Sequence, residues 1–244
     1  MVDVVYVLGR GSRWKDREFA YSLRSVEVFL SNVRKVFVVG AHPRCPAPVS
    51  WQHIPMTDHH TLPACNINDC LREACRSPQI SETFLRMDDD CFLLKPADAE
   101  AAPNYCRGTL RAHIEWFKTR PNNPYEACLR VTETWLTEQA FPTVNFEIHG
   151  PMLFQKSALL AILDRVNPSV GYLSRTLYGN IMKVSGTGIN DSKINETLTT
   201  SQIQARVQHR PFFSIGDLGL NKPMWDFLES TYNGGQRIFG PVSA

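Results

Sequence analysis

The stretch VDVVYVLGRGS at residues 2–12 decides the fold class. It begins with a run of mostly apolar, β-branched residues, and two glycines and a serine close it. A short apolar run that ends in turn-forming residues is typical of a buried strand that leads into a loop. The loop then lies at the carboxyl end of a strand, which is where open α/β sheets bind ligands.

The segments that follow complete a strand–helix–strand unit. Within residues 16–30, apolar side chains recur at helical spacing, at Phe19, Leu23, Val26 and Leu30. A second apolar run at residues 35–39 ends at Gly40. Two strands joined by a helix are usually parallel neighbours in one sheet. We therefore expect an α/β fold with a mixed, mostly parallel sheet that is flanked by helices.

The rest of the chain continues this alternation. The pattern predicts helices over residues 66–74, 125–140, 157–165 and 222–232, and strands over residues 51–54, 82–87, 91–94 and 152–154. Residues 41–63 and the glycine-rich stretch 186–190 are expected to be loops. Because the sequence has no internal repeat and no linker-like segment, residues 1–244 are expected to form a single domain.

Composition excludes several classes of protein. The chain is 43% hydrophobic with a net charge of +2, so it can form a core but lacks the strongly basic balance of a dedicated nucleic-acid binder. Its seven cysteines include no CxxC pair, which disfavours a zinc ribbon or a disulfide framework and fits a reducing compartment. We see no signal-peptide pattern and no apolar run long enough to span a membrane, so a cytoplasmic location is expected, in a bacterium or a phage-infected cell. The oligomeric state has no signature in the sequence.

Three consecutive aspartates separate two apolar runs in the stretch MDDDCFLL at residues 87–94. On an extended backbone, Asp88 and Asp90 project to one side and Asp89 to the other. Two carboxylates on one side are suited to a hard divalent cation, Mg²⁺ or Mn²⁺, which would neutralise charge on a leaving nucleotide diphosphate. An acidic surface turn is the simpler alternative, but the apolar flanks favour a metal site at Asp88 and Asp90.

The opening loop is the candidate segment for binding a nucleotide donor. Its glycines let the backbone approach a nucleotide, and its arginines are suited to phosphate groups. The alternative is a flexible loop with solvated arginines, because the spacing matches neither a Walker loop nor GxGxxG. The donor-binding residues predicted here are Leu8, Gly9, Arg10, Ser12 and Arg13.

Isolated polar residues complete the candidate site. Asn66 is expected at the start of a helix, with capping as its default role and donor contact as the second. His149, next to a Gly-Pro pair, is a candidate third metal ligand or general base, although a lone histidine is more often structural. Asp191 and Lys193 follow the glycine-rich stretch, and Asp217 lies between two glycines. Each of these three is either a site residue or an ordinary loop residue.

Several segments together resemble the Stealth family of sugar-phosphate transferases and compact relatives in phages and bacteria. They are DVVY (3–6), YSLRSVE (21–27), RKVFVV (34–39), FLRMDDDCFL (84–93), HGP and FQK (149–151 and 154–156) and FFSIGD (212–217). The resemblance implies a GT-A-like, Rossmann-like fold, a nucleotide-sugar donor and a divalent metal. It also implies that Arg24, the aspartates 88–90, His149 and Asp217 are site residues. Without it, Arg24 is expected to form a surface ion pair with Glu27.

We predict a metal-dependent glycosyltransferase that moves a sugar from a nucleotide-sugar donor, with a UDP-sugar favoured, to a hydroxyl group of a glycan or of a hydroxymethylated base in phage DNA. Metal binding is assigned to Asp88, Asp90 and His149, catalysis to His149, Asp191 and Asp217, and donor binding to the opening loop with Arg24, Asn66, Asp89 and Lys193. Two alternatives remain, a Stealth-type sugar-1-phosphate transferase that acts on a polysaccharide and a non-catalytic nucleotide-sugar-binding module. Simple glycosyl transfer is preferred because Arg10 and Arg13 stand where the family usually has acidic residues.

Overall fold

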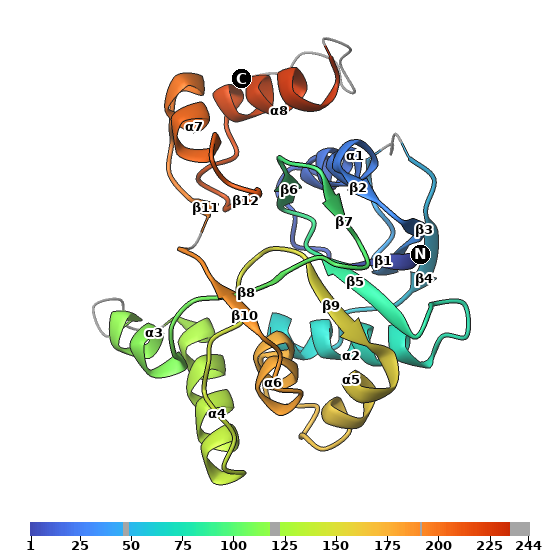
Figure 1. The fold of residues 1–244 in the computed structure, drawn as a ribbon, viewed down its shortest axis with the longest axis vertical. Coiled ribbons are helices and arrows are strands. Elements are labelled where there is room, and N and C mark those ends of the chain that lie inside the picture. Colours follow the sequence, from blue (N-terminus) through green and yellow to red (C-terminus); the bar gives the residue numbers. More distant parts are fainter. Residues whose placement is uncertain (46–48, 118–122, 191, 235–244) are drawn as a thin grey trace.

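A computed structural model describes residues 1–45, 49–117, 123–190 and 192–234. Its central sheet has the strand order β4-β3-β1-β5-β9 (Figure 1). The bounds are β1 (Val2–Leu8), β3 (Val33–Gly40), β4 (Gln52–Pro55), β5 (Thr83–Met87) and β9 (Met152–Gln155). All neighbours are parallel except β5 and β9, which are antiparallel. The predicted mixed α/β architecture with a mostly parallel, Rossmann-like sheet is confirmed.

Helices cover both faces of this sheet. Helix α1 (Arg17–Phe29) packs on one face, and α2 (Pro63–Arg76), α5 (Lys156–Leu163) and α6 (Ser174–Ile181) lie on the other (Figure 1). Successive side chains of a strand point to opposite faces. In β1, Val4 and Tyr6 therefore join the core under α1, while Val5 joins the core on the side of α2.

The order of the strands creates a switch point between β1 and β5. From β1 the chain moves outward to β3 and β4, and it then returns to the other side of β1 to form β5. Ligands of open α/β sheets bind outside the carboxyl ends of the strands at such a point. Tyr6 of β1 pairs with Met87 of β5. The loop after β1 and the aspartates after β5 therefore emerge side by side.

A second, smaller sheet brings C-terminal residues to this edge. It consists of β6 (Cys91–Leu93), β12 (Phe212–Ile215) and β11 (Lys193–Ile194), and it lies close to α7 (Thr200–Val207) and α8 (Lys222–Tyr232) (Figure 1). The short strands β2 (Leu30–Ser31) and β7 (Ala97–Asp98) also pair. Helices α3 (Leu110–Phe117) and α4 (Pro124–Glu138) pack against each other, and α4 also contacts α6 (Figure 1). Strands β8 (Asn104–Cys106) and β10 (Gly186–Gly188) form a separate parallel pair.

Several predicted boundaries need correction. Helix α2 begins at Pro63 instead of near Asn66, because the fixed φ and missing N–H of proline suit the first helical position. The predicted glycine-rich loop contains β10, which pairs in parallel with β8. The sequence pattern does not predict α3, α6 or α7. The seven cysteines all lie among the described residues and are free thiols. None of the helices in the described parts combines the length and apolarity needed to cross a bilayer.

Candidate active site

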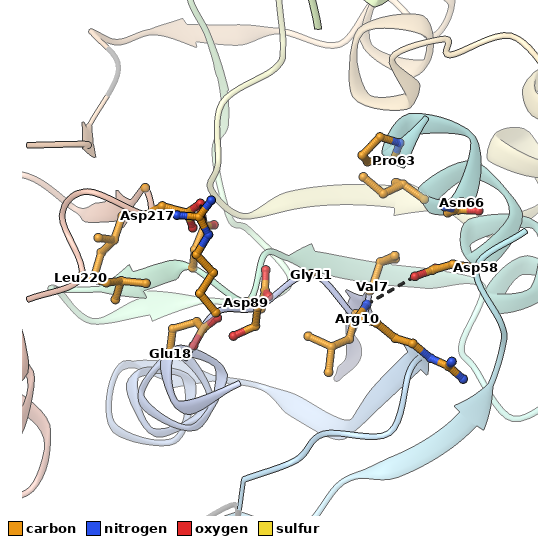
Figure 2. A pocket seen from close by; sticks show the side chains of 18 of the residues that line it. Val7, Arg10, Gly11, Glu18, Asp58, Pro63, Asn66, Asp89, Asp217 and Leu220 are labelled. Atoms are coloured by element: carbon orange, nitrogen blue, oxygen red, sulfur yellow. Dashed lines mark hydrogen bonds and ion pairs between the residues drawn. The ribbon is translucent and has the colours of Figure 1, made fainter. Parts of the chain in front are cut away.

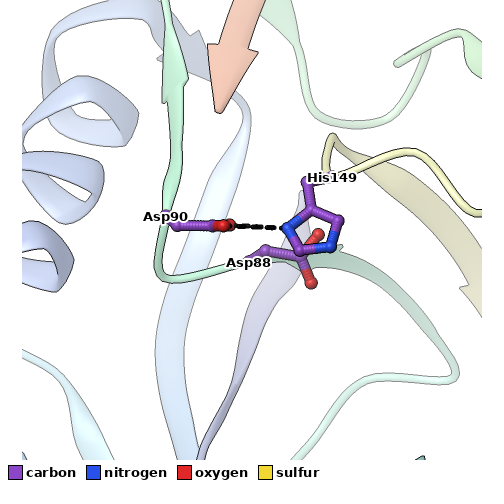
Figure 3. A group of neighbouring side chains, drawn as sticks. All are labelled: Asp88, Asp90 and His149. Carbon is purple, nitrogen blue, oxygen red and sulfur yellow. Dashed lines mark hydrogen bonds and ion pairs between the residues drawn. The ribbon is translucent and has the colours of Figure 1, made fainter. Parts of the chain in front are cut away.

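The three aspartates form a turn between β5 and β6. The backbone N–H of Cys91 donates to the carbonyl oxygen of Asp88 at 3.1 Å, so the prediction of an extended backbone is wrong here. The side chains of Asp88 and Asp90 nevertheless both lie beside His149 (Figure 3). One ligand atom from each of these three residues lies within 4.8 Å of the other two. The turn therefore gathers the three residues that the sequence assigns to metal binding.

Two neighbouring elements hold the turn in place. The hydroxyl oxygen of Ser22 on α1 lies 2.5 Å from the carbonyl oxygen of Cys91 and 3.2 Å from that of Asp88. On the other side, the backbone N–H of Ile215 in β12 donates to the carbonyl oxygen of Asp90 at 3.0 Å. The position of the aspartates thus depends on α1 and on the C-terminal sheet together.

Two buried arginines surround Asp88. Arg175 Nη1 donates to Asp88 Oδ2 at 2.7 Å, and Arg86 Nη2 donates to Asp88 Oδ1 at 3.3 Å. Burial alone would raise the pKa of Asp88, but the charges of Arg175 and Arg86 outweigh it, so this pKa lies below its ordinary value. Burial and the neighbouring Arg175 lower the pKa of Arg86 to about 10, which leaves it charged at neutral pH. Asp88 is therefore ionised.

Asp90 is held by an imidazole and an ammonium group. His149 Nδ1 lies 2.9 Å from each carboxylate oxygen of Asp90 (Figure 3). Lys193 Nζ donates to Asp90 Oδ2 at 3.1 Å. Burial would raise the pKa of Asp90, but His149 and Lys193 lower it below its usual range. When Nδ1 of a histidine faces a carboxylate, Nε2 is the nitrogen that can accept a proton or bind a metal.

Asp89 differs from its two neighbours. It lies next to Glu18 of α1 on the wall of a cavity (Figure 2). Burial, followed by the negative charges of Asp90 and Glu18, raises the pKa of Asp89 well above its ordinary value. Burial also raises the pKa of Glu18, whose Oε2 has no hydrogen-bond partner among the described residues. Carboxyl groups in such a position can hold a proton and donate hydrogen bonds.

The cavity has a volume of about 910 Å³ and lies outside the carboxyl ends of β1 and β5. This is near the upper end of the range for small-molecule sites. Among the residues that the structure describes, the wall of this cavity includes all the predicted donor-binding residues except Arg24. They are Leu8, Gly9, Arg10, Ser12, Arg13, Asn66, Asp89 and Lys193. Asp90 and Asp217 also line this space, which we call the donor cavity.

The opening loop is ordered by hydrogen bonds to its own backbone and to Asp58. Ser12 Oγ accepts from the N–H groups of Trp14 at 3.1 Å and Asp16 at 2.9 Å. The N–H of Arg10 donates to Asp58 Oδ2 at 3.3 Å (Figure 2). The Ser12 side chain therefore shapes the loop, while the side chain of Arg10 leads away from Asp89.

Other predicted residues have partners within the protein. Asp217 lies at the rim, where its Oδ2 is 3.5 Å from Nε of Arg13 and both side chains are exposed. Asn66 Oδ1 accepts from the N–H groups of His59 at 3.0 Å and His60 at 2.9 Å. Asn66 therefore orders the preceding loop, and its predicted role as a helix cap is wrong.

Arg24 is the predicted residue that the structure does not bring to the donor cavity. It forms the surface ion pair with Glu27 that its spacing predicts, and its Nε donates to the carbonyl oxygen of Tyr232 at 3.2 Å. These contacts fix α1 to α8 and give no support to a donor-binding role. Asp191, a predicted catalytic residue, lies outside the described residues.

The sequence analysis misses the buried charges at this site. Arg86 is the one charged residue in β5, and Arg175 is the one charged residue in α6. Arginine is rarely buried without a partner, so the single charge in the mostly apolar strand β5 is the available signal for Arg86, whereas Arg175 lies in a helix with several polar residues. Glu18 gives less warning, because an acidic residue in the first turn of a helix is common.

Comparisons with known proteins find only limited sequence and structural similarity. No family model matches the chain. Over 178 residues it is 27% identical to the exopolysaccharide phosphotransferase CpsY, both from Mycobacterium tuberculosis and from Mycobacterium bovis, covering 64% of this chain and 32% of each relative. The crystal structure of HddC from Yersinia pseudotuberculosis aligns with a TM-score of 0.27 and 12% identity, over 38% of this chain and 49% of that one, which is too slight to carry an argument. The chain thus spans about a third of the length of the curated relatives it matches.

Proposed function

We propose that this chain is a transferase that moves a sugar-1-phosphate group from a nucleotide-sugar donor to an acceptor hydroxyl group. The observation that carries this proposal is the grouping of Asp88, Asp90 and His149 beside the donor cavity, whose wall includes Asp90. The likeness to the mycobacterial exopolysaccharide phosphotransferases supports the class of reaction. It also favours phosphate transfer, the alternative of the sequence analysis, over simple sugar transfer.

Asp88 and Asp90 are suited to bind a divalent cation. Both carboxyl groups have lowered pKa values and are therefore ionised, as ligands of Mg²⁺ or Mn²⁺ must be. The ammonium group of Lys193 beside Asp90 indicates that the position attracts positive charge. A cation bound by Asp88 and Asp90 would offset the charge of the donor diphosphate.

The proposed step uses His149 as the general base. The acceptor oxygen attacks the phosphorus atom that carries the sugar, and the hydroxyl proton passes to His149 Nε2. A new oxygen–phosphorus bond forms, the bond from this phosphorus to the bridging oxygen breaks, and a nucleoside monophosphate leaves with the electron pair. Asp90 orients the imidazole through Nδ1, and Lys193 and Arg13 offset charge on the leaving nucleotide.

Glycosyl transfer is the second candidate. It is favoured by Arg10 and Arg13, which replace the acidic residues expected from the Stealth resemblance. The two reactions break different bonds, because attack at the anomeric carbon releases a nucleoside diphosphate and leaves no phosphate on the product. The identity of the released nucleotide therefore separates them.

We expect incubation with Mn²⁺, a panel of UDP-sugars and a saccharide acceptor to release UMP. The product should retain one phosphate group by mass spectrometry and phosphorus NMR. Protein carrying Asp90→Asn, purified in the same way, controls for contaminating nucleotide hydrolases. Release of UDP with a phosphate-free product would establish glycosyl transfer instead. Donor binding without any release of nucleotide would indicate that the chain is a non-catalytic nucleotide-sugar-binding module.

We expect His149→Gln to lower kcat by about a hundredfold or more while leaving the affinity for Mn²⁺ within about threefold of wild type. Glutamine keeps a polar side chain of similar length but cannot act as a base at neutral pH. Isothermal titration with Mn²⁺ and steady-state kinetics measure the two quantities separately. A variant that loses Mn²⁺ binding would make His149 a metal ligand, which is the other role that the sequence predicts for it.

A further inference from the structure

A second cavity, of about 680 Å³, opens beside His149. Its wall combines residues from α3, the start of α4 and the segment before β9. It shares Lys193 and Asn195 with the donor cavity, and it adds His149. A molecule bound here would therefore reach the imidazole that the proposed function uses as a base. We call this space the acceptor cavity.

Aromatic rings form one side of the acceptor cavity. Trp116 packs edge-on against Phe117, with the ring centroids 4.9 Å apart, and lies 5.9 Å from the ring of His113. Phe117 in turn contacts Tyr125 at 5.9 Å. Trp116 is half exposed, although its neighbour Phe117 is buried. A large ring that is held by other rings and still exposed provides a flat apolar platform for a ligand.

Polar groups lie on the same wall as these rings. The cavity lining includes the guanidinium group of Arg107, the amide of Asn123 and the carboxylate of Glu147. Glu147 Oε1 accepts from the N–H of Thr176 at 3.0 Å, and this contact orients the carboxylate. These groups are planar and supply both donors and acceptors. An apolar platform flanked by such groups suits a sugar ring, whose C–H face is apolar and whose edge carries hydroxyl groups.

The charges of the acceptor cavity argue against DNA as its ligand. A DNA site needs several lysines and arginines that follow the phosphate backbone. Here Arg107 and Lys193 share the described wall with Glu147, and the whole chain carries a net charge of only +2. The mixture of signs fits a neutral saccharide better than a polyanion.

We infer that the acceptor cavity binds a saccharide, with a pyranose ring against Trp116 and one hydroxyl group directed toward His149. The catalytic meaning of this site rests on the proposed function. Binding of the sugar itself needs only the rings and the planar polar groups. The acceptor class that follows is a glycan, rather than a hydroxymethylated DNA base.

NMR titration of the isotope-labelled full chain tests this inference. The indole N–H signal of Trp116 is assigned from the spectrum of W116F. The probes are the methyl glycosides of glucose, galactose, mannose and N-acetylglucosamine, and a short oligonucleotide that contains hydroxymethylated cytosine. We expect at least one glycoside to shift the Trp116 signal in a saturable way. We also expect W116A, followed through backbone N–H signals that shift with the same glycoside in the wild type, to bind it about tenfold more weakly. W51F, whose position lines neither cavity in the described structure, is the matched control and should bind as wild type does.

Two results would overturn the inference. One is a Trp116 signal that responds to the oligonucleotide and to none of the glycosides, and the other is a Trp116 signal that responds to no probe. UDP with Mn²⁺ is a separate probe of the donor cavity. If a glycoside shifts Trp116 but UDP does not bind, the proposed function fails while the saccharide site stands. If UDP binds and no glycoside does, only the saccharide site fails.

Discussion

The variant Asp90→Asn should reduce kcat/KM by about a thousandfold or more while leaving the fold intact. Asparagine keeps the shape of aspartate but removes the charge that faces both His149 and Lys193. The change would therefore weaken cation binding and release the imidazole from its orienting partner at the same time. Steady-state kinetics with saturating Mn²⁺ measure the loss, and circular dichroism checks the fold.

A matched control separates this effect from the loss of any carboxylate. Asp226 also pairs with a lysine, Lys222 at 2.6 Å, but lies on α8 and lines neither cavity in the described structure. Asp226→Asn should change kcat/KM by less than about twofold, as expected for an exposed ion pair. If Asp90→Asn were as active as this control, the carboxylate at position 90 would have no part in the reaction.

The variant Arg175→Met should lower the free energy of unfolding by about 3–5 kcal/mol. Arg175 is 2% exposed, and besides Asp88 it binds the carbonyl oxygen of Gly150 at 2.9 Å. Methionine fills much of the volume but leaves Asp88, whose side chain is 12% exposed, with Arg86 as its remaining strong cation, at the longer distance of 3.3 Å. Urea unfolding in the presence of a metal chelator measures the loss without compensation by a bound cation.

Two further variants make this result interpretable. In Asp88→Asn combined with Arg175→Met, the buried Arg86 also loses its carboxylate partner, so the double variant should be no more stable than Arg175→Met. Arg130 pairs with Glu126 on the surface of α4, and Arg130→Met should cost less than about 1 kcal/mol. A loss for Arg175→Met as small as that of Arg130→Met would contradict a buried ion pair at Asp88.

The sequence predicts a helix or strand best where the segment has a simple pattern of buried and exposed residues. The run at residues 2–8 is buried on both sides, so it consists mostly of apolar residues and marks the central strand β1. Helix α1 leaves one face at least partly exposed, at Arg24, Glu27 and Val28, so its apolar spacing is visible. Helix α6 is almost entirely buried, including the polar Thr176 and Asn180, so no amphipathic period exists to be detected. Strand β10 contains two glycines, which ordinarily indicate a loop.

The same distinction applies to the residues of the candidate site, because some have a local sequence signal and others do not. Asp88 and Asp90 can be found from the sequence because carboxylates between two apolar runs need a reason to be there. His149 comes from a segment about sixty residues further along the chain. Its position beside Asp88 and Asp90 can be predicted only when β9 is known to pair with β5. The role of Arg175 is even harder to predict from the local sequence, because its pairing with Asp88 depends on how α6 packs under the sheet. Charge pairing between distant segments is a property of the packed chain.

The proposed reaction depends most on a cation between the carboxylates of Asp88 and Asp90 and the diphosphate of a donor. Anomalous diffraction from crystals grown with Mn²⁺ and UDP tests it most directly. We expect an anomalous peak at coordination distance from carboxylate oxygens of both residues and from phosphate oxygens in the donor cavity. Density for UDP in that cavity, with no anomalous peak beside Asp88 and Asp90, would contradict it.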